Sequence, residues 1–447
     1  MNPVHIAGTK GKGSTSAFIS SILSQYLPTK RSIHAERLPS SVGLYTSPHL
    51  RFVRERIQIN NQPISEELFA KCFWELWNRL EATSSSAPVQ NSSPRSESGK
   101  PVYFHYLTLV ALHCYLEQQV GTAVIECGIG GEYDTTNIFS APSVTGVTSL
   151  GIDHQSLLGD TIESIAWHKA GIFKPDVPAF TVPQPKGALD VLHERARERA
   201  TELQVVHPHP ALDTIRLGLQ GNFQKLNASL AIAVSAAHLQ KLGYTGSPEP
   251  QDQKSPLPDE FIAGLEQARL GGRCDRRPDS KLQNLTWYLD GGHTLESIEM
   301  AGKWFGSVAD SQSTKILIFN QQTRNASALA QRLHSTLSTA LFNDKPFKHA
   351  IFCTNTTYKD AGYKPDLVSM NTNKDDVGSL RVQKELAETW DSIDSDGDVD
   401  VLSTIEEAVA KARAIAGSVR EVEVLVTGSL HLVGGCIEVL EGEREGA

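Results

Sequence analysis

The sequence predicts an α/β protein built on two mainly parallel sheets. Short apolar segments alternate with longer amphipathic ones, which is the pattern of strands joined by helices. The alternation runs from residue 1 to 272, gives way to a basic, turn-rich stretch at 273–280, and resumes over 281–447. A chain of 447 residues is long enough for two domains with separate cores. We therefore expect a larger first domain, a linker and a smaller, Rossmann-like second domain with these boundaries.

A glycine-rich turn near residue 10 is the strongest local signal. Residues 4–7 predict a strand, and the segment G-T-K-G-K-G-S from Gly8 to Ser14 leads from it into an apolar helix. Glycines let backbone N–H groups converge on an anion, while a helix N-terminus and lysines supply positive charge. The spacing is not that of a Walker A loop, because Gly13 separates Lys12 from Ser14. The segment predicts a phosphate site, and the alternative is a turn that binds nothing.

Three polar residues, Ser47, Glu126 and His154, each follow a predicted strand. Open α/β sheets bind ligands at the carboxyl ends of their strands, so these side chains are candidates for the same site as the glycine-rich turn. An apolar strand ending in one acid is the Walker B pattern, in which the carboxylate holds Mg²⁺. The alternative for Glu126 is an acid that caps the next turn. Lys169 lies in the last turn of a predicted helix, where a cation complements the helix dipole.

Several local predictions concern less distinctive segments. Alternating apolar residues over 51–60 predict an edge strand, and the serine-rich stretch 83–100 predicts a disordered insert. Asp160 is expected to cap the following helix, with Glu163 closing a capping box. The acidic stretch 391–400 is expected to be a solvated loop, since it lacks the bidentate glutamate of a calcium-binding loop.

Composition describes an ordinary globular protein and excludes some functions. Hydrophobic residues make up 40% and charged residues 21%, and no apolar run is long enough to cross a bilayer. A net charge of −9 argues against general binding of nucleic acid or of anionic membranes. The six cysteines are widely separated, which predicts reduced thiols in an intracellular compartment.

The predicted first strand begins almost at Met1, so the sequence predicts no signal or transit peptide. Two alternatives stay open: the natural protein begins here, or an upstream segment is missing. We expect a cytoplasmic protein, or a mitochondrial one if a leader has been lost.

Five ordered segments together resemble the folylpolyglutamate synthase family, in its eukaryotic form, within the Mur ligase superfamily. The resemblance runs almost unbroken from Val4 to about Val182 and resumes in patches to the end. The segments are G-T-K-G-K-G-S-T, Y-T-S-P-H-L-R-F-V-R-E-R-I-Q-I-N, V-I-E-C-G-I-G-G-E-Y-D-T-T-N, S-L-G-I-D-H-Q-S-L-L-G-D-T-I-E-S-I-A-W-H-K-A-G-I-F-K and Y-L-D-G-G-H-T. The resemblance implies a Mur-ligase-type ATP-binding domain followed by a Rossmann-like domain.

The resemblance also implies roles for individual residues. It assigns nucleotide binding to Gly11, Lys12, Gly13, Ser14, Asn222, Arg273, Asp290 and His293. It implies two Mg²⁺ ions held by Ser47, Glu126 and His154, with Glu126 shared, and a monovalent cation is a further candidate. Lys12, His154 and Lys169 are the implied catalytic residues, and Lys169 matches a lysine that is carboxylated in some members.

The activity implied is ATP-dependent addition of L-glutamate to the γ-carboxylate of a reduced folate or its polyglutamates, through an acyl phosphate. We expect a monomer without a nucleic-acid or membrane partner. The nearest alternative is a dihydrofolate synthase, which would use the same chemistry on dihydropteroate. A truncated relative that binds ATP without catalysis is another. A P-loop kinase or GTPase is disfavoured by Gly13 and by the second α/β region.

Overall fold

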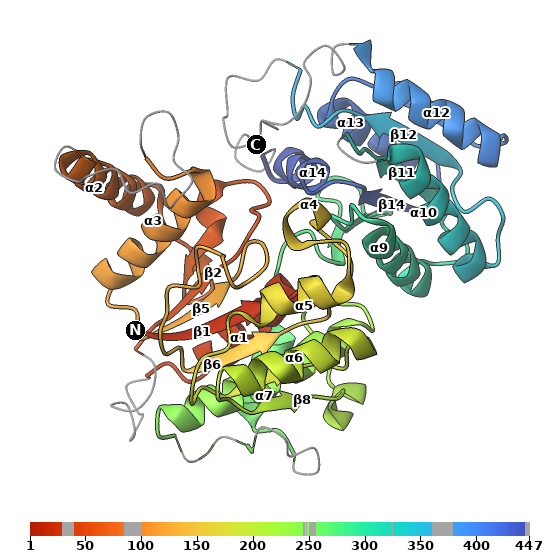
Figure 1. Ribbon diagram of the computed structural model, residues 1–447. Coiled ribbons are helices and arrows are strands. Elements are labelled where there is room, and N and C mark those ends of the chain that lie inside the picture. The colour runs from red at the N-terminus through yellow and green to blue at the C-terminus, as the bar shows by residue number, and fades with distance from the viewer. Residues whose placement is uncertain are drawn as a thin grey trace. The chain divides into compact units, whose positions relative to one another are not determined.

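The computed structural model describes residues 1–28, 40–84, 100–244, 246, 248–249, 256–322, 325–359 and 379–442. The chain forms two compact units (Figure 1). The first consists of Met1–His49, Arg54–Leu219 and Phe223–Leu270, and the second of Leu50–Val53, Gln220–Asn222 and Gly271–Ala447. The chain therefore passes between the units more than once, and two short segments from the first part of the sequence belong to the second unit.

An eight-stranded sheet with the order β4-β3-β2-β5-β1-β6-β7-β8 forms the centre of the first unit. Its strands are β1 (Asn2–Ala7), β2 (Val42–Tyr45), β3 (Ile57–Ile59), β4 (Gln62–Pro63), β5 (Thr122–Glu126), β6 (Val144–Val147), β7 (Ala179–Thr181) and β8 (Leu203–Val205). The six strands from β2 to β8 in this order are parallel, while β3 and β4 pair antiparallel at one edge. The parallel core brings several strand ends to one edge of the sheet.

Helices cover both faces of this sheet. They are α1 (Lys12–Ser24), α2 (Glu66–Ser84), α3 (Tyr103–Glu117), α4 (Gln155–Leu158), α5 (Ile162–Ala170), α6 (Lys186–Glu198), α7 (Gln224–Lys241) and α8 (Asp259–Gln267), with 3₁₀ turns η2 (Val53–Arg56) and η3 (Pro210–Asp213). Alternate side chains of β1 face opposite ways. Val4 and Ile6 join a core with α1, α7 and α8, whereas Ala7 joins a separate core with α5 and α6.

The second unit contains a six-stranded sheet with the order β13-β12-β11-β14-β10-β9. Its elements are β9 (Asp275–Pro278), β10 (Leu285–Leu289), α9 (Leu295–Val308), β11 (Thr314–Phe319), α10 (Ala326–Leu341), β12 (His349–Cys353), α12 (Arg381–Ile393), β13 (Asp398–Leu402), α13 (Ile405–Ala416), β14 (Val422–Thr427) and α14 (Leu430–Gly442). Only β9 runs antiparallel to its neighbour. Residues of β10, β11 and β14 pack with α13 and α14 in one apolar core.

The structure corrects several local predictions. Within 51–60, a 3₁₀ turn precedes a strand of only three residues, β3. Thr161, not Asp160, caps α5, because the Thr161 hydroxyl accepts the hydrogen bond from Ser164 N. The acidic stretch 391–400 is not a simple loop, since α12 ends and β13 begins within it.

The expected linker and the expected insert lie in different settings. The stretch 273–280, expected as a linker, carries β9, which pairs with β10 in the second sheet. Of the predicted insert 83–100, residues 85–99 lie outside the described part of the chain. All six cysteines are buried free thiols, as the sequence predicts. No helix among the described residues is long and apolar enough to cross a membrane.

A buried histidine on α7 contacts β5 and the residue that precedes β6. His238, on α7, contacts the Thr122 hydroxyl through Nε2 at 2.9 Å and the Ser143 hydroxyl through Nδ1 at 2.7 Å. Burial lowers the pKa of His238 from 6.5 to about 4. The native protein therefore holds this imidazole neutral at pH values where the unfolded chain would protonate it.

This histidine predicts acid sensitivity of the fold. Between pH 7 and pH 5, His238 becomes protonated in the unfolded state but stays neutral in the native state. This change in pH therefore lowers the free energy of unfolding by on the order of 2 kcal/mol. Urea unfolding of the protein and of His238→Gln at both pH values measures this contribution. The variant should be less stable at pH 7 but lose less stability at pH 5. An equal loss in both proteins would contradict the assignment.

Candidate active site

The glycine-rich turn connects β1 to α1 and begins the helix. Gly11 is the N-cap residue, its carbonyl accepts the first helical hydrogen bond from Thr15 N at 2.8 Å, and its φ is 89°. A side chain at this position would be strained by the backbone and would meet the Asn227 side chain. Only glycine fits the turn here, so the strand can lead directly into a helix N-terminus whose N–H groups suit an anion.

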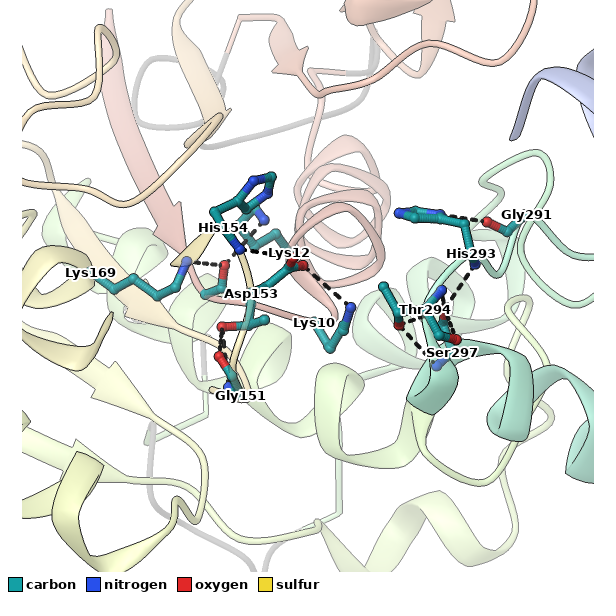
Figure 2. Close-up of polar contacts among 12 residues, drawn as sticks. Lys10, Lys12, Gly151, Asp153, His154, Lys169, Gly291, His293, Thr294 and Ser297 are labelled. Atoms are coloured by element: carbon teal, nitrogen blue, oxygen red, sulfur yellow. Dashed lines mark hydrogen bonds and ion pairs between the residues drawn. The ribbon is translucent and has the colours of Figure 1, made fainter. Parts of the chain in front are cut away.

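Two lysine amines donate hydrogen bonds to one carbonyl in this turn. The Gly8 carbonyl oxygen accepts from Lys12 Nζ at 3.1 Å and from Lys169 Nζ at 2.8 Å. Figure 2 shows both side chains, Lys12 from the turn and Lys169 from the end of α5. Two amines and no carboxylate thus meet at the same atom, which leaves the turn with positive charge to offer an anion.

Burial changes the protonation of one of these amines. Lys169 is 3% exposed. Burial, followed by the charge of Lys12, lowers the pKa of Lys169 from 10.5 to about 7. Desolvation disfavours the charged form of a buried amine. At neutral pH the Lys169 amine is therefore close to half neutral, unlike a lysine in water.

The loop after β6 supports the other side of the turn. The Thr9 hydroxyl donates to Gly151 O at 3.1 Å, and Lys10 Nζ lies 3.5 Å from an Asp153 carboxylate oxygen. Asp153 also accepts a hydrogen bond from His154 N at 3.0 Å, and His154 has a left-handed φ of 51° (Figure 2). The predicted residue His154 therefore belongs to a loop that contacts the glycine-rich turn directly.

Glu126 and Ser47 lie together on the opposite side of the turn. Glu126 is 3% exposed, and its Oε2 accepts a hydrogen bond from Ser47 N at 3.1 Å. A Cβ atom added to Gly13 would lie 3.5 Å from the same carboxylate oxygen. The sheet therefore brings Glu126 to the start of α1, as its place at a strand end predicts.

The chemistry of these donors fits a magnesium ion. Mg²⁺ prefers one or two carboxylates, with its remaining positions filled by water and phosphate oxygens. Glu126 would supply the carboxylate, and Ser47 would supply a hydroxyl, beside the glycine-rich turn. Among the described residues, no cluster of three or more histidine, cysteine, aspartate or glutamate side chains is arranged as a metal cage. The ligand set Ser47, Glu126 and His154 stays a prediction.

Two residues on α7 lie at the glycine-rich turn and were not predicted as site residues. Gln224 Nε2 donates to the Ser14 hydroxyl at 3.2 Å, and Asn227 Nδ2 donates to Gln224 Oε1 at 2.8 Å. Both are at least nine-tenths buried in a helix of small and apolar residues. Two buried amides three residues apart on one helix face were a usable sequence signal.

The second unit holds its predicted residues around Asp290. This carboxylate is 6% exposed and accepts hydrogen bonds from Cys274 N and Gly292 N, both at 2.9 Å. Burial raises the pKa of Asp290, and the nearby Arg273 opposes the shift. Asp290 thus links the backbone at Cys274 to the turn that precedes α9.

His293 lies in that turn. Its Nδ1 is 2.9 Å from Gly291 O, and its backbone N donates to the Ser297 hydroxyl at 3.0 Å (Figure 2). Thr294 and Ser297 form a reciprocal capping box at the start of α9, which fixes the backbone beside His293. Asn222, the remaining predicted nucleotide contact, belongs to the 220–222 segment of the second unit.

No protein-family model matches the chain. It is 43% identical over 449 residues to a folylpolyglutamate synthase of Neurospora crassa, and the matched region covers 99% of this chain and 81% of the relative. It is 46% identical over 445 residues to a folylpolyglutamate synthase of Saccharomyces cerevisiae, and the matched region covers 99% of this chain and 77% of the relative. The chain belongs to the folylpolyglutamate synthase family.

Solved structures of folylpolyglutamate synthases share the fold. The Thermotoga maritima enzyme matches with a TM-score of 0.70 at 23% identity, covering 99% of this chain and 89% of that one. The Mycobacterium tuberculosis enzyme complexed with ADP and AMPPCP matches with a TM-score of 0.70 at 21% identity, covering 99% and 91%. The predicted fold class and the family resemblance are confirmed.

The conformation of Gly11 predicts a selective loss of nucleotide binding. Gly11→Ala should weaken ADP binding by roughly 10-fold or more, because alanine disfavours a positive φ and its methyl group meets Asn227. Gly151→Ala is the matched control, since a Cβ atom at Gly151 has nothing within 4 Å. Titration calorimetry with both purified variants measures the effect. Equal affinities would show that the turn does not bind the nucleotide.

Proposed function

We propose that this chain adds L-glutamate to the γ-carboxylate of a reduced folate or its polyglutamates, using ATP. One observation supports the proposal most strongly. The amines of Lys12 and Lys169 both donate to the Gly8 carbonyl in the glycine-rich turn, and the buried Glu126 lies beside this turn. Family membership supplies the reaction, and this set of groups suits a reaction in which a phosphoryl group is transferred. The ATP-binding domain would be 1–272, with 273–280 joining it to the glutamate-ligase domain 281–447.

The first step would be phosphorylation of the acceptor. The acceptor γ-carboxylate attacks the γ-phosphorus of ATP, the bond to ADP breaks, and an acyl phosphate forms. Backbone N–H groups at the start of α1, together with Lys12, stabilise the negative charge that develops on the phosphoryl oxygens. Gly11, Gly13 and Ser14 form the rest of this cradle.

The second step would form the amide. The amine of L-glutamate attacks the acyl carbon, and inorganic phosphate leaves with the electrons of the C–O bond. The incoming amine must lose protons during this step. Lys169, with a pKa near 7, can exchange a proton at neutral pH. The neutral amine is also the form that combines with carbon dioxide, which supports carboxylation of Lys169 as a proposal.

Two Mg²⁺ ions are proposed as cofactors, held by Ser47, Glu126 and His154. Bound there, they would neutralise charge on the phosphates and polarise the transferred phosphoryl group. A monovalent cation is a further candidate. Arg273, Asp290, His293 and Asn222 would contribute nucleotide contacts from the second unit. We also propose a cytoplasmic monomer, with a mitochondrial location if a leader is missing.

Glutamate-dependent release of ADP tests the proposed reaction. With ATP and Mg²⁺, the purified chain should turn over tetrahydrofolate and yield a product heavier by one glutamyl residue, identified by mass spectrometry. Glu126→Gln should lower kcat by roughly 100-fold or more, because a neutral amide replaces the one carboxylate among the proposed Mg²⁺ ligands. Glu194→Gln, at an exposed position of α6, is the matched control.

Two results of this assay would contradict the proposed reaction. Turnover of dihydropteroate alone would assign a dihydrofolate synthase. ATP binding without turnover of either acceptor would contradict the ligase proposal for this chain.

A further inference from the structure

Arg56 is a buried arginine in the first unit. It is 8% exposed and ends the 3₁₀ turn η2. Its Nε donates a hydrogen bond to Nδ1 of His49 at 2.9 Å, and its guanidinium carbon lies 5.7 Å from the centre of the Tyr103 ring. Within the described part of the chain, no carboxylate forms an ion pair with Arg56 and no acceptor binds its two Nη groups.

Among the described residues, one other arginine is buried, and carboxylates neutralise it. Arg195 is 7% exposed and pairs with Glu132 at 2.6 Å and with Glu198 at 2.5 Å. The partly buried Arg413 likewise pairs with Asp279 at 2.9 Å. A buried charge is costly unless it is paired and hydrogen-bonded. Among the described residues Arg56 contacts a histidine and an aromatic ring instead, which suits it to an anion supplied by a ligand.

An acidic residue in the same region does not serve as this anion. Asp134 and Arg56 both lie close enough to the Tyr45 phenol to influence its pKa. The Asp134 carboxylate is already used within its own loop, where Oδ1 accepts from Thr136 Oγ1 at 2.6 Å and Oδ2 accepts from Ile129 N at 2.8 Å. Asp134 therefore orders the loop after β5 and leaves the Nη groups of Arg56 for another partner.

The sheet places Arg56 in line with the candidate active site. Thr46 N donates to Arg56 O at 3.1 Å, and the next residue, Ser47, is the one bonded to Glu126. The strand order β3-β2-β5-β1 thus arranges Arg56, Ser47, Glu126 and the phosphate turn along one edge. Three strand spacings separate Arg56 from the turn, or about 14 Å.

This order separates the acceptor side from the nucleotide side. In phosphoryl transfer the attacking and leaving oxygens lie roughly in line through phosphorus. If the turn holds the ATP phosphates and Glu126 lies beside the γ-phosphate, the attacking carboxylate approaches from beyond Glu126. That is the side on which Arg56 lies. The terminal glutamate of the acceptor carries a second carboxylate, at its α-carbon, which must also be accommodated there.

We propose that Arg56 binds the α-carboxylate of the acceptor's terminal glutamate and so presents the γ-carboxylate to ATP. The inference rests on the proposed function and adds a residue that selects the γ-linkage. A planar guanidinium with two unengaged Nη groups matches the two oxygens of a carboxylate. Contact with the Tyr103 ring and the hydrogen bond to His49 hold the plane of the guanidinium in a fixed orientation.

A pair of acceptors isolates this contact. One is tetrahydropteroylglutamate, and the other carries 4-aminobutyrate in place of glutamate, so it keeps the reacting carboxylate and lacks the α-carboxylate. The wild-type protein should prefer the glutamate form in kcat/KM by roughly 10- to 100-fold. In Arg56→Gln this preference should fall close to 1, through a higher KM for the glutamate form. The KM values for ATP and for L-glutamate should not change.

The preference is a ratio measured on one preparation, so any misfolded fraction cancels. Arg54→Gln is the matched control, because Arg54 lies two residues earlier and donates to Ile64 O at 3.2 Å. It should keep the wild-type preference. An Arg56→Gln variant that loses activity equally with both acceptors, or whose KM rises for ATP instead, would overturn the inference. Absence of turnover by the wild-type protein with both acceptors would instead overturn the proposed function.

Discussion

The convergence of two lysine amines on the Gly8 carbonyl is the interaction on which the candidate site depends. Lys12 and Lys169 are far apart in the sequence, and their amines donate to the same oxygen at 3.1 and 2.8 Å. Two cations at one carbonyl repel each other, and burial adds the cost of desolvation. The protein accommodates this by lowering the pKa of Lys169. An arriving polyphosphate would relieve the same repulsion, so the strain in the free protein favours binding of an anion.

The order of strands then determines which chemistry surrounds that anion. Because β5 lies beside β1, Glu126 comes next to the start of α1, and because β2 follows, Ser47 reaches Glu126. The antiparallel strand β3 extends the row to Arg56. We therefore propose that a single sheet edge holds the phosphate site at the glycine-rich turn, a carboxylate for Mg²⁺ and a cation for the acceptor. The nucleotide, the metal and the acceptor are assigned to successive strands, which gives each a distinct place in an in-line transfer.

The sequence predicted the parts of this site that depend on local rules. A strand, a glycine turn and a helix are read within a dozen residues, and Glu126 follows from its place at a strand end. The burial of Lys169 could not be predicted, because the residue that it contacts, Gly8, is 161 positions away. The strand β13 was missed because its aspartates disfavour strands, yet its pairing with β12 from His349 opposite Asp398 stabilises it. Thr161 and Asp160 are both good caps, and the extended backbone of Thr161 selects it.

A titration of Lys169 measures whether its amine shares a buried site with Lys12 at Gly8. The ammonium of this residue can be followed by NMR of protein labelled with ¹⁵N-lysine, with Lys169→Met to assign the signal. We expect a pKa of about 7 for Lys169 in the free protein. Replacement of Lys12 by methionine should raise this pKa, because a neighbouring positive charge is removed. A pKa near the ordinary lysine value of about 10.4, unaffected by Lys12→Met, would show that the two amines do not share a buried site at Gly8.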